Sequence, residues 1–280
     1  MGKPHWFIAF GFFVLLVVAF IFFPIKGSTE KKKEDNSTRS SFNEDDWAES
    51  RLESLQKDTS LLIRELWNKS KSESDKLSKA DQLIQSSKLS DLSGAYDLGT
   101  FFLVKLANST GHSTDLFKAG DRAYLTSILM DPADSTRNYF VNQAISLLKK
   151  ASDSEPKNDT IRIRLAQTYM DGTENVMNGV QILLDIVAKN SNQAEALFTL
   201  GRFGIISGQF EKAINRLNKV VYLQPQNADA YILLAEAYEK NGEAKKAVKH
   251  LEKGISLLDD PEIIKILSDH LQELKQGKLP

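Results

Sequence analysis

The second half of the chain repeats itself every 34 residues, and this feature constrains the fold more than any other. The segment 194–227 (AEALFTLGRFGIISGQFEKAINRLNKVVYLQPQN) aligns without a gap on the segment 228–261 (ADAYILLAEAYEKNGEAKKAVKHLEKGISLLDDP). Corresponding positions keep their character: Leu200 and Leu234, Gly201 and Ala235, Gly208 and Gly242, Ala213 and Ala247, Leu217 and Leu251. A fixed period of this length predicts a solenoid, in which each repeat packs mainly on its neighbours.

Each repeat has the pattern of two short helices joined by a turn. We expect Gly208 and Gly242 to end the first helix in the left-handed conformation that glycine adopts without strain. Small residues are expected where two helices cross closely, at Gly201, Ala213, Ala235 and Ala247. Pro225 should stop the second helix of the 194–227 repeat, because proline cannot continue a helix. The pattern predicts an all-α chain.

These positions resemble the tetratricopeptide repeat (TPR) family. The 228–261 repeat has the large, aromatic and small residues of the family pattern at Tyr231, Leu234, Ala235, Tyr238, Gly242 and Ala247. Its proline is displaced to Pro261, and the 194–227 repeat has Gly204 where the family carries an aromatic residue. The resemblance implies a TPR-like α-solenoid, a superhelix of helical hairpins, of the kind found in membrane-anchored bacterial TPR proteins.

Weaker copies precede the two regular repeats. The segment 159–193 fits with one extra residue and a long turn, DGTENVMNG, and the segment 113–158 fits if it carries an insertion around LMDPADSTRN. The segment 76–112 has traces of a further unit at Ala80, Leu83, Ala95, Phe101 and Phe102. We therefore predict repeats over 113–158, 159–193, 194–227 and 228–261, preceded by a helical region, 46–112, with a degenerate unit.

The C-terminal segment 262–280 is expected to cap the solenoid. Within it, EIIKILSDHLQELKQ places four apolar residues on one helical face: Ile263, Leu267, Leu271 and Leu274. A solenoid needs such a helix because its last repeat would otherwise leave an apolar face in water.

The N-terminal segment 1–26 has the pattern of a transmembrane anchor. The run from Trp6 to Phe23 carries no charge and would span roughly 27 Å as a helix, close to the thickness of the bilayer interior. A cleaved signal peptide is the alternative, but the exit FFPIKGS stays bulky up to Ile25 and lacks a small-residue cleavage pattern. We expect residues 6–23 to contact membrane lipid.

The segment 27–45 (GSTEKKKEDNSTRSSFNED) predicts a flexible polar linker, because it has too few apolar residues to offset its conformational entropy. Its lysines favour a cytoplasmic C-terminal domain by the positive-inside rule. Long domains translocate largely regardless of charge, so the sequence predicts a single-pass membrane location and leaves the side of the membrane open.

An amphipathic helix is expected over 46–71. Its apolar residues recur at spacings of about three and four: Trp47, Leu52, Leu55, Leu62 and Leu66. We expect this helix to pack on the following domain. The alternative is a short coiled coil, which would make the chain a self-associating structural subunit, a homo-oligomer driven by 46–71.

Nothing in the sequence indicates catalytic chemistry. The chain has no cysteine, a net charge of −1, and none of the phosphate-binding, metalloprotease or nucleophile-elbow motifs. His250 and His270 lack ligand partners at suitable spacing and are expected on solvated helix faces. We therefore expect no enzyme activity, no cofactor, no metal site and no binding of nucleic acid.

A protein-binding groove is implied by the resemblance, since the first helices of TPR units line a concave face at recurring places. Carried over residue by residue, these places are Ile163, Gln167, Met170, Glu195, Phe198, Arg202, Ile205, Asp229, Ile232 and Glu236. The residues of the family's chaperone-tail clamp are not matched. A partner peptide or helix would bury the apolar members, although the chain's own N-terminal helix or a second subunit could cover them instead. The prediction is a membrane-tethered scaffold for protein partners that are themselves membrane-associated.

Overall fold

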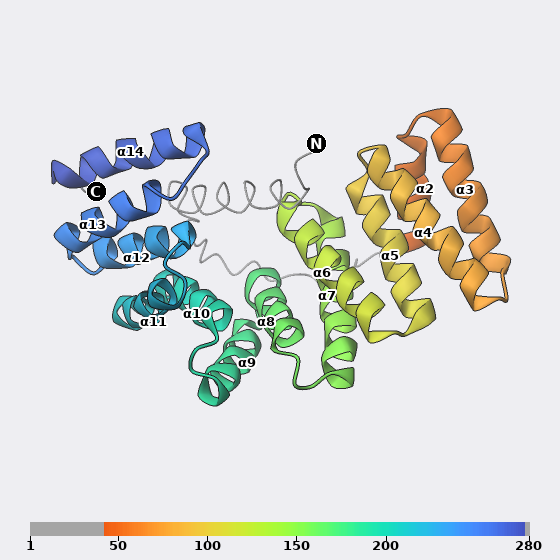
Figure 1. Ribbon diagram of the computed structural model, residues 1–280. Helices are drawn as coiled ribbons and strands as arrows, with labels where there is room; N and C mark the ends of the chain where they lie inside the picture. Colours follow the sequence, from red (N-terminus) through yellow and green to blue (C-terminus); the bar gives the residue numbers. More distant parts are fainter. Residues whose placement is uncertain (1–41, 278–280) are drawn as a thin grey trace, which may run out of the picture. The chain divides into compact units, whose positions relative to one another are not determined.

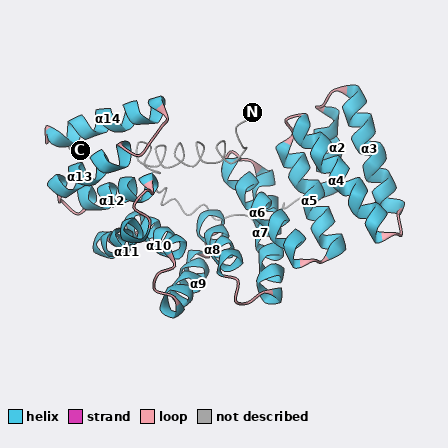
Figure 2. Ribbon diagram, viewed as in Figure 1, coloured by secondary structure: helices cyan, strands magenta, loops and turns pink. Residues whose placement is uncertain are grey.

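A computed structural model describes residues 42–277, and all thirteen regular elements within that range are α-helices (Figure 1, Figure 2). The predicted anchor, 1–26, and almost all of the predicted linker, 27–45, lie outside the described residues, and helix α2 already begins at Glu44. None of the described helices is long and apolar enough to be a candidate membrane span. The described chain divides into two compact units, one ending at Leu183 and the other beginning at Leu184.

The N-terminal unit consists of seven helices and the first half of an eighth. They are α2 (Glu44–Glu53), α3 (Lys57–Ser72), α4 (Lys76–Leu92), α5 (Tyr96–Thr110), α6 (Ser113–Leu129), α7 (Ser135–Ser154), α8 (Asp159–Gly172) and the start of α9 (Val176–Lys189). Helices that follow one another in sequence pack against one another, with α4 on α5 and α6 on α7 as the closest pairs. This sequential packing is typical of a helical repeat.

The expectation of one helix over 46–71 is wrong, because the segment forms two helices. Helix α2 ends at Glu53, and α3 begins at Lys57. The predicted stripe is right at Leu52, which is completely buried, and at Trp47 and Leu55, which pack against the core. It is wrong beyond the break, because Ile63 and Trp67 form the buried face of α3, whereas Leu62 is 46% exposed. The break changes the helical register, so residues before and after it do not share the face that a continuous helix would give them.

An aromatic cluster forms the centre of the N-terminal unit. The Trp67 ring lies 5.5 Å from Phe101 and 5.7 Å from Phe102, both edge to face. From α2, Trp47 adds contacts at 5.9 Å to Phe101 and 5.7 Å to Phe140. Large rings in this arrangement bury much apolar area and give the unit a specific core.

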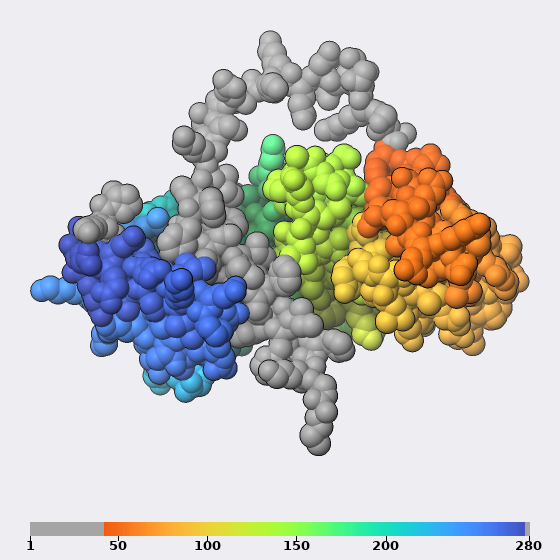
Figure 3. Space-filling view, turned by 90° about the horizontal axis from the view of Figure 1, so that it is seen from above, coloured from red at the N-terminus to blue at the C-terminus, as the bar shows by residue number. Residues whose placement is uncertain are grey.

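Charged pairs join helix α2 to the helices that follow. Arg51 donates two hydrogen bonds to the Asp97 carboxylate on α5, at 2.7 and 2.9 Å. Glu44 accepts from Lys105 at 2.6 Å and from the Tyr139 hydroxyl at 2.7 Å. In the space-filling view the orange residues of α2 and α3 accordingly lie directly against the yellow residues of α4 and α5 (Figure 3).

The insertion expected in 113–158 is not a long loop. Only Met130–Asp134 connects the long helices α6 and α7, so most of the extra residues extend the helices themselves. Asp134 ends the connection by accepting the Thr136 N–H at 2.8 Å, which caps α7. The long turn expected around DGTENVMNG is similarly reduced to Thr173–Asn175.

The C-terminal unit contains the end of α9 and five further helices. They are α10 (Ala194–Ile206), α11 (Phe210–Leu223), α12 (Ala228–Lys240), α13 (Ala244–Ile255) and α14 (Pro261–Lys275). Each packs on the next, and the first helices of consecutive repeats, α10 and α12, also touch. The predicted left-handed glycines are confirmed, with φ of 72° at Gly208 and 79° at Gly242.

Small residues allow the helices of a repeat to cross closely, as predicted. A Cβ atom on Gly201 would lie 2.7 Å from the Leu217 Cγ atom of α11, so no larger residue fits. Ala213 and Ala247 are completely buried. Helix α11 ends at Leu223, before Pro225.

The last helix, α14, covers the end of this unit. Pro261 does not end the preceding repeat but occupies the first turn of α14, where its missing N–H costs nothing, and Asp260 caps the same turn. Ile263, Leu267, Leu271 and Leu274 are all buried on the face that α14 turns toward its unit.

Candidate protein-binding surface

The predicted groove residues of the N-terminal unit lie on α8. Ile163 is completely buried, whereas Gln167 and Met170 are half-buried. The three residues share one helical face, because their spacings are four and three. A partner at this face would reach Gln167 and Met170 but not the Ile163 side chain.

The remaining predicted positions lie on α10 and α12 of the C-terminal unit, which pack against each other. On α10, Glu195 is exposed, Phe198 and Arg202 are half-buried, and Ile205 is 7% exposed. On α12, Asp229 is 7% exposed, Ile232 is 1% exposed, and Glu236 is half-buried.

The isoleucines at these positions belong to the core of the C-terminal unit. Ile205 and Ile232 lie in one hydrophobic cluster, and Phe198 packs against its edge. Ile232 fits closely against α13, since a Cβ atom on Gly254 would lie 2.9 Å from the Ile232 Cγ1 atom. The groove positions accessible to a partner are therefore mostly polar. Whether a partner binds there stays a prediction.

Asp229 is a buried carboxylate without a hydrogen-bond donor. Its Oδ1 atom is inaccessible to water and has no partner. Burial raises the pKa of Asp229 to about 6. Although Asp229 lies in the first turn of α12, it is not the cap: Asn227 performs that role, accepting the Ala230 N–H at 2.9 Å.

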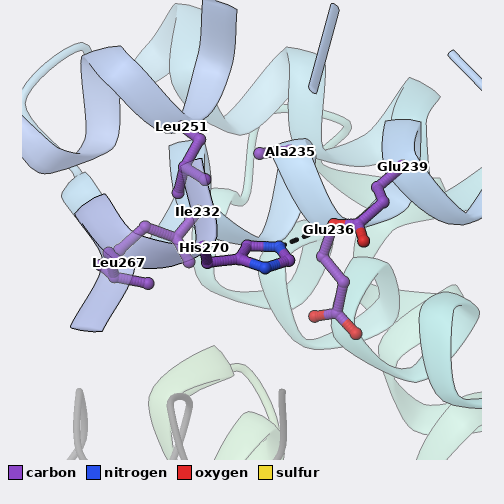
Figure 4. Close-up of a pocket in the computed structure, with 7 residues that line it drawn as sticks. All are labelled: Ile232, Ala235, Glu236, Glu239, Leu251, Leu267 and His270. Atoms are coloured by element: carbon purple, nitrogen blue, oxygen red, sulfur yellow. Dashed lines mark hydrogen bonds and ion pairs between the residues drawn. The ribbon is translucent and has the colours of Figure 1, made fainter. Parts of the chain in front are cut away.

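The expectation that His270 lies on a solvated face is wrong, because it joins the capping helix to α12. Its Nε2 atom lies 2.9 Å from Glu239 Oε2, and only 15% of the imidazole side chain is exposed (Figure 4). The hydrogen bond that the His270 imidazole donates to Glu239 raises the pKa of His270 against the opposing effect of burial. The partner comes from another helix, so no spacing in the sequence around His270 could have indicated it.

The same expectation is wrong for His250. Its ring stacks on Tyr238 at 5.3 Å and near Tyr231 at 6.1 Å, both from α12. Burial lowers the pKa of His250, so the neutral ring is favoured. Both histidines thus contribute to packing within the C-terminal unit. Within residues 42–277, no group of three histidine or acidic side chains is arranged to hold a metal ion.

Comparison with known proteins identifies the repeat. Residues 204–268 match the family described as Tetratricopeptide repeat. The anaphase-promoting complex subunit CDC16 of Saccharomyces cerevisiae is 28% identical over 102 residues, which are 36% of this chain and only 12% of that protein.

Two groups of solved structures are also similar. A crystal structure of the MamA protein has a TM-score of 0.48 and 19% identity, covering 72% of this chain and 96% of MamA. YrrB, described as a TPR protein with an unusual peptide-binding site, has a TM-score of 0.45 and 19% identity, covering 71% of this chain and 92% of YrrB.

Proposed function

The C-terminal part of this chain is made of tetratricopeptide repeats, a protein-interaction fold, and we propose that the protein is a membrane-tethered scaffold. In this proposal the surface formed by α10 and α12 holds a segment of a partner protein. The anchor confines that surface to a membrane, where the partner is itself located.

The arrangement of α10 and α12 is the observation that carries the binding proposal. The two helices are the first helices of consecutive repeats and pack side by side. Glu195, Phe198, Arg202 and Glu236 reach or approach the surface at the recurring positions. Residues presented at a fixed spacing by a rigid pair of helices can contact successive side chains of an extended or helical segment.

A membrane tether would support the scaffold function by raising the effective concentration of the binding surface near other proteins of that membrane. A binding domain fixed to a membrane meets other proteins of that membrane far more often than a freely diffusing one, without any new contact. The support for the tether is the uncharged run 6–23. Deleting residues 2–26 should move the protein from the membrane fraction to the supernatant. An unchanged distribution would contradict the tether and leave the binding proposal standing.

Photo-crosslinking in intact cells tests the binding surface. A photoreactive phenylalanine analogue at Phe198 or at Glu236 should crosslink to one discrete partner. The same analogue at Tyr222, which is 84% exposed on α11, is the matched control and should not. Equal crosslinking from Tyr222, or none from the two test positions, would refute the assignment of the surface. A crosslink to a second copy of the chain would instead favour self-association.

A further inference from the structure

We propose that two carboxylates of α12, Asp229 and Glu236, receive two basic side chains of the partner segment. This inference rests on the proposed binding function and names the chemistry of the partner. The two residues are seven positions apart, so they lie on the same face of α12, about 10 Å apart along its axis.

Asp229 supplies the first argument, because its burial has no explanation within the fold. It is 7% exposed and its Oδ1 atom accepts no hydrogen bond. Capping of α12 is already performed by Asn227, so the helix does not need the carboxylate for that purpose. A buried acceptor without a donor is unfavourable, and each such group in a folded protein calls for a missing donor. A cationic group from outside the chain would approach the carboxylate through the 7% of Asp229 that is exposed and would supply the missing positive charge.

Glu236 supplies the second argument. It is half-buried and forms no hydrogen bond or ion pair within residues 42–277. His270 is engaged by Glu239, and in the close-up the Glu236 carboxylate points away from the imidazole ring (Figure 4). Lys240 acts on Glu236 through its charge and forms no hydrogen bond or ion pair with it. Burial raises the pKa of Glu236, as it does that of Asp229, and the charges of Lys240 and His270 near Glu236 oppose this effect without cancelling it.

The separation of the two carboxylates limits the occupant. Side chains about 10 Å apart along a helix cannot share one metal ion, whose ligands lie within about 2–3 Å of it. In an extended segment, residues three apart are also separated by about 10 Å. Lysine and arginine side chains carry only donors, and arginine pairs with a carboxylate through two parallel hydrogen bonds. In the proposed complex the partner segment is extended and has basic residues at positions i and i+3; enriched peptides with basic residues seven apart would overturn the extended form.

Selection of peptides from a random dodecapeptide phage library on the full chain tests this inference. The most enriched peptide is then synthesised with a fluorophore, and its affinity is measured by fluorescence anisotropy. Enriched peptides should carry two basic residues three apart. Replacing both with glutamine should weaken binding at least tenfold, and the affinity should fall as salt concentration rises.

Variants of the protein provide the reciprocal test. Asp229→Asn together with Glu236→Gln should also weaken the peptide at least tenfold. Once these carboxylates are neutralised, replacing the basic residues of the peptide with glutamine should weaken its binding only slightly further. The matched control is Glu211→Gln, which neutralises an exposed acid in the first turn of α11 and should change the affinity less than twofold. The melting temperature of the Asp229→Asn variant should not fall, which separates lost binding from lost folding.

The outcomes distinguish the two proposals. Peptides that bind without basic residues, or that bind the double variant as tightly as the native chain, would overturn the cationic partner and leave the binding function in place. A library that yields no binder, together with silent crosslinking at Glu236, would overturn both.

Discussion

The two units of the molecule differ in whether their buried and half-buried carboxylates form ion pairs with arginine. In the N-terminal unit, Asp97 pairs with Arg51, Asp91 pairs with Arg122 and Asp121 pairs with Arg164, each across two helices. In the C-terminal unit, the more deeply buried Asp229 and the half-buried Glu236 have no such partner. Paired charges hold helices in position, whereas unpaired ones destabilise the fold that contains them.

The difference concerns these carboxylates and not buried polar groups in general. A protein keeps an unsatisfied buried group most readily where the group has a task other than folding. The N-terminal unit also holds buried polar atoms without a hydrogen-bond partner, at Gln82, Asp121 and Arg164, but Asp121 and Arg164 form an ion pair with each other. The C-terminal unit packs its helices through small residues and keeps a buried acid, Asp229, that has neither an ion-pair partner nor a hydrogen-bond donor at Oδ1.

The largest expected effect concerns the aromatic core. Trp67→Ala should destabilise the N-terminal unit by about 3–5 kcal/mol, because it removes a fully packed ring and leaves a cavity. Hydrogen exchange should show the loss of protection within residues 44–110. The control is Leu92→Ala, at a side chain that is 85% exposed, which should cost less than about 0.5 kcal/mol. Equal loss of protection over 194–275 would contradict the assignment of Trp67 to one unit.

The next effect has the opposite sign. Asp229→Asn should stabilise the C-terminal unit by about 1–3 kcal/mol at pH 8, because the folded chain no longer holds a buried negative charge. The pKa of Asp229 is raised to about 6 in the folded state, above its ordinary value. The cost of ionisation therefore develops as pH rises from about 4 to 6, and the benefit of the substitution should vanish as pH falls through that window. Thermal unfolding at pH 4, 6 and 8 measures it, and a benefit that is independent of pH would contradict the cause.

Neutralising a paired carboxylate should be harmful. Asp97→Asn should destabilise the N-terminal unit by about 1–2 kcal/mol. The partly buried Arg51 guanidinium would then lose the carboxylate to which it donates two hydrogen bonds. The exposed ion pair between Glu65 and Lys69 offers a matched control, and Glu65→Gln should leave the urea midpoint unchanged within error. Urea titration compares the two variants. If Asp97→Asn and Asp229→Asn shift stability in the same direction, the contrast between the units fails.

The smallest effect concerns the attachment of the last helix. The pKa of His270 is raised in the folded chain, chiefly by its hydrogen bond with Glu239. The stability that protonated His270 contributes to the folded chain is therefore fully present below about pH 6.5. It is lost as pH rises through the raised pKa of His270. His270→Gln should lower stability by about 1 kcal/mol at pH 6 and by less at pH 9. Hydrogen exchange of residues 261–275 at both pH values detects it, and an equal loss at both would indicate packing alone.

The repeats could be predicted because their signals are local and recur. Gly208 and Gly242 end helices in a way that depends on their own backbone. Gly201 and Gly204 let α10 cross α11 closely, at Leu217 and Ala213. The break between α2 and α3 was missed because Leu62 and Leu66 continue a helical spacing across it. The candidate surface was predicted only in part, because the resemblance places residues on a helix but does not say what covers Ile163, Ile205 or Ile232.

By itself the sequence determined the period, the turns, the small residues at crossings and the apolar face of the final helix, since each depends on neighbours along the chain. Only the tertiary structure decided that Arg51 meets Asp97, that His270 meets Glu239, and that Asp229 is buried without a donor. Those facts depend on residues from different helices, whose approach is set by packing and leaves no spacing in the sequence.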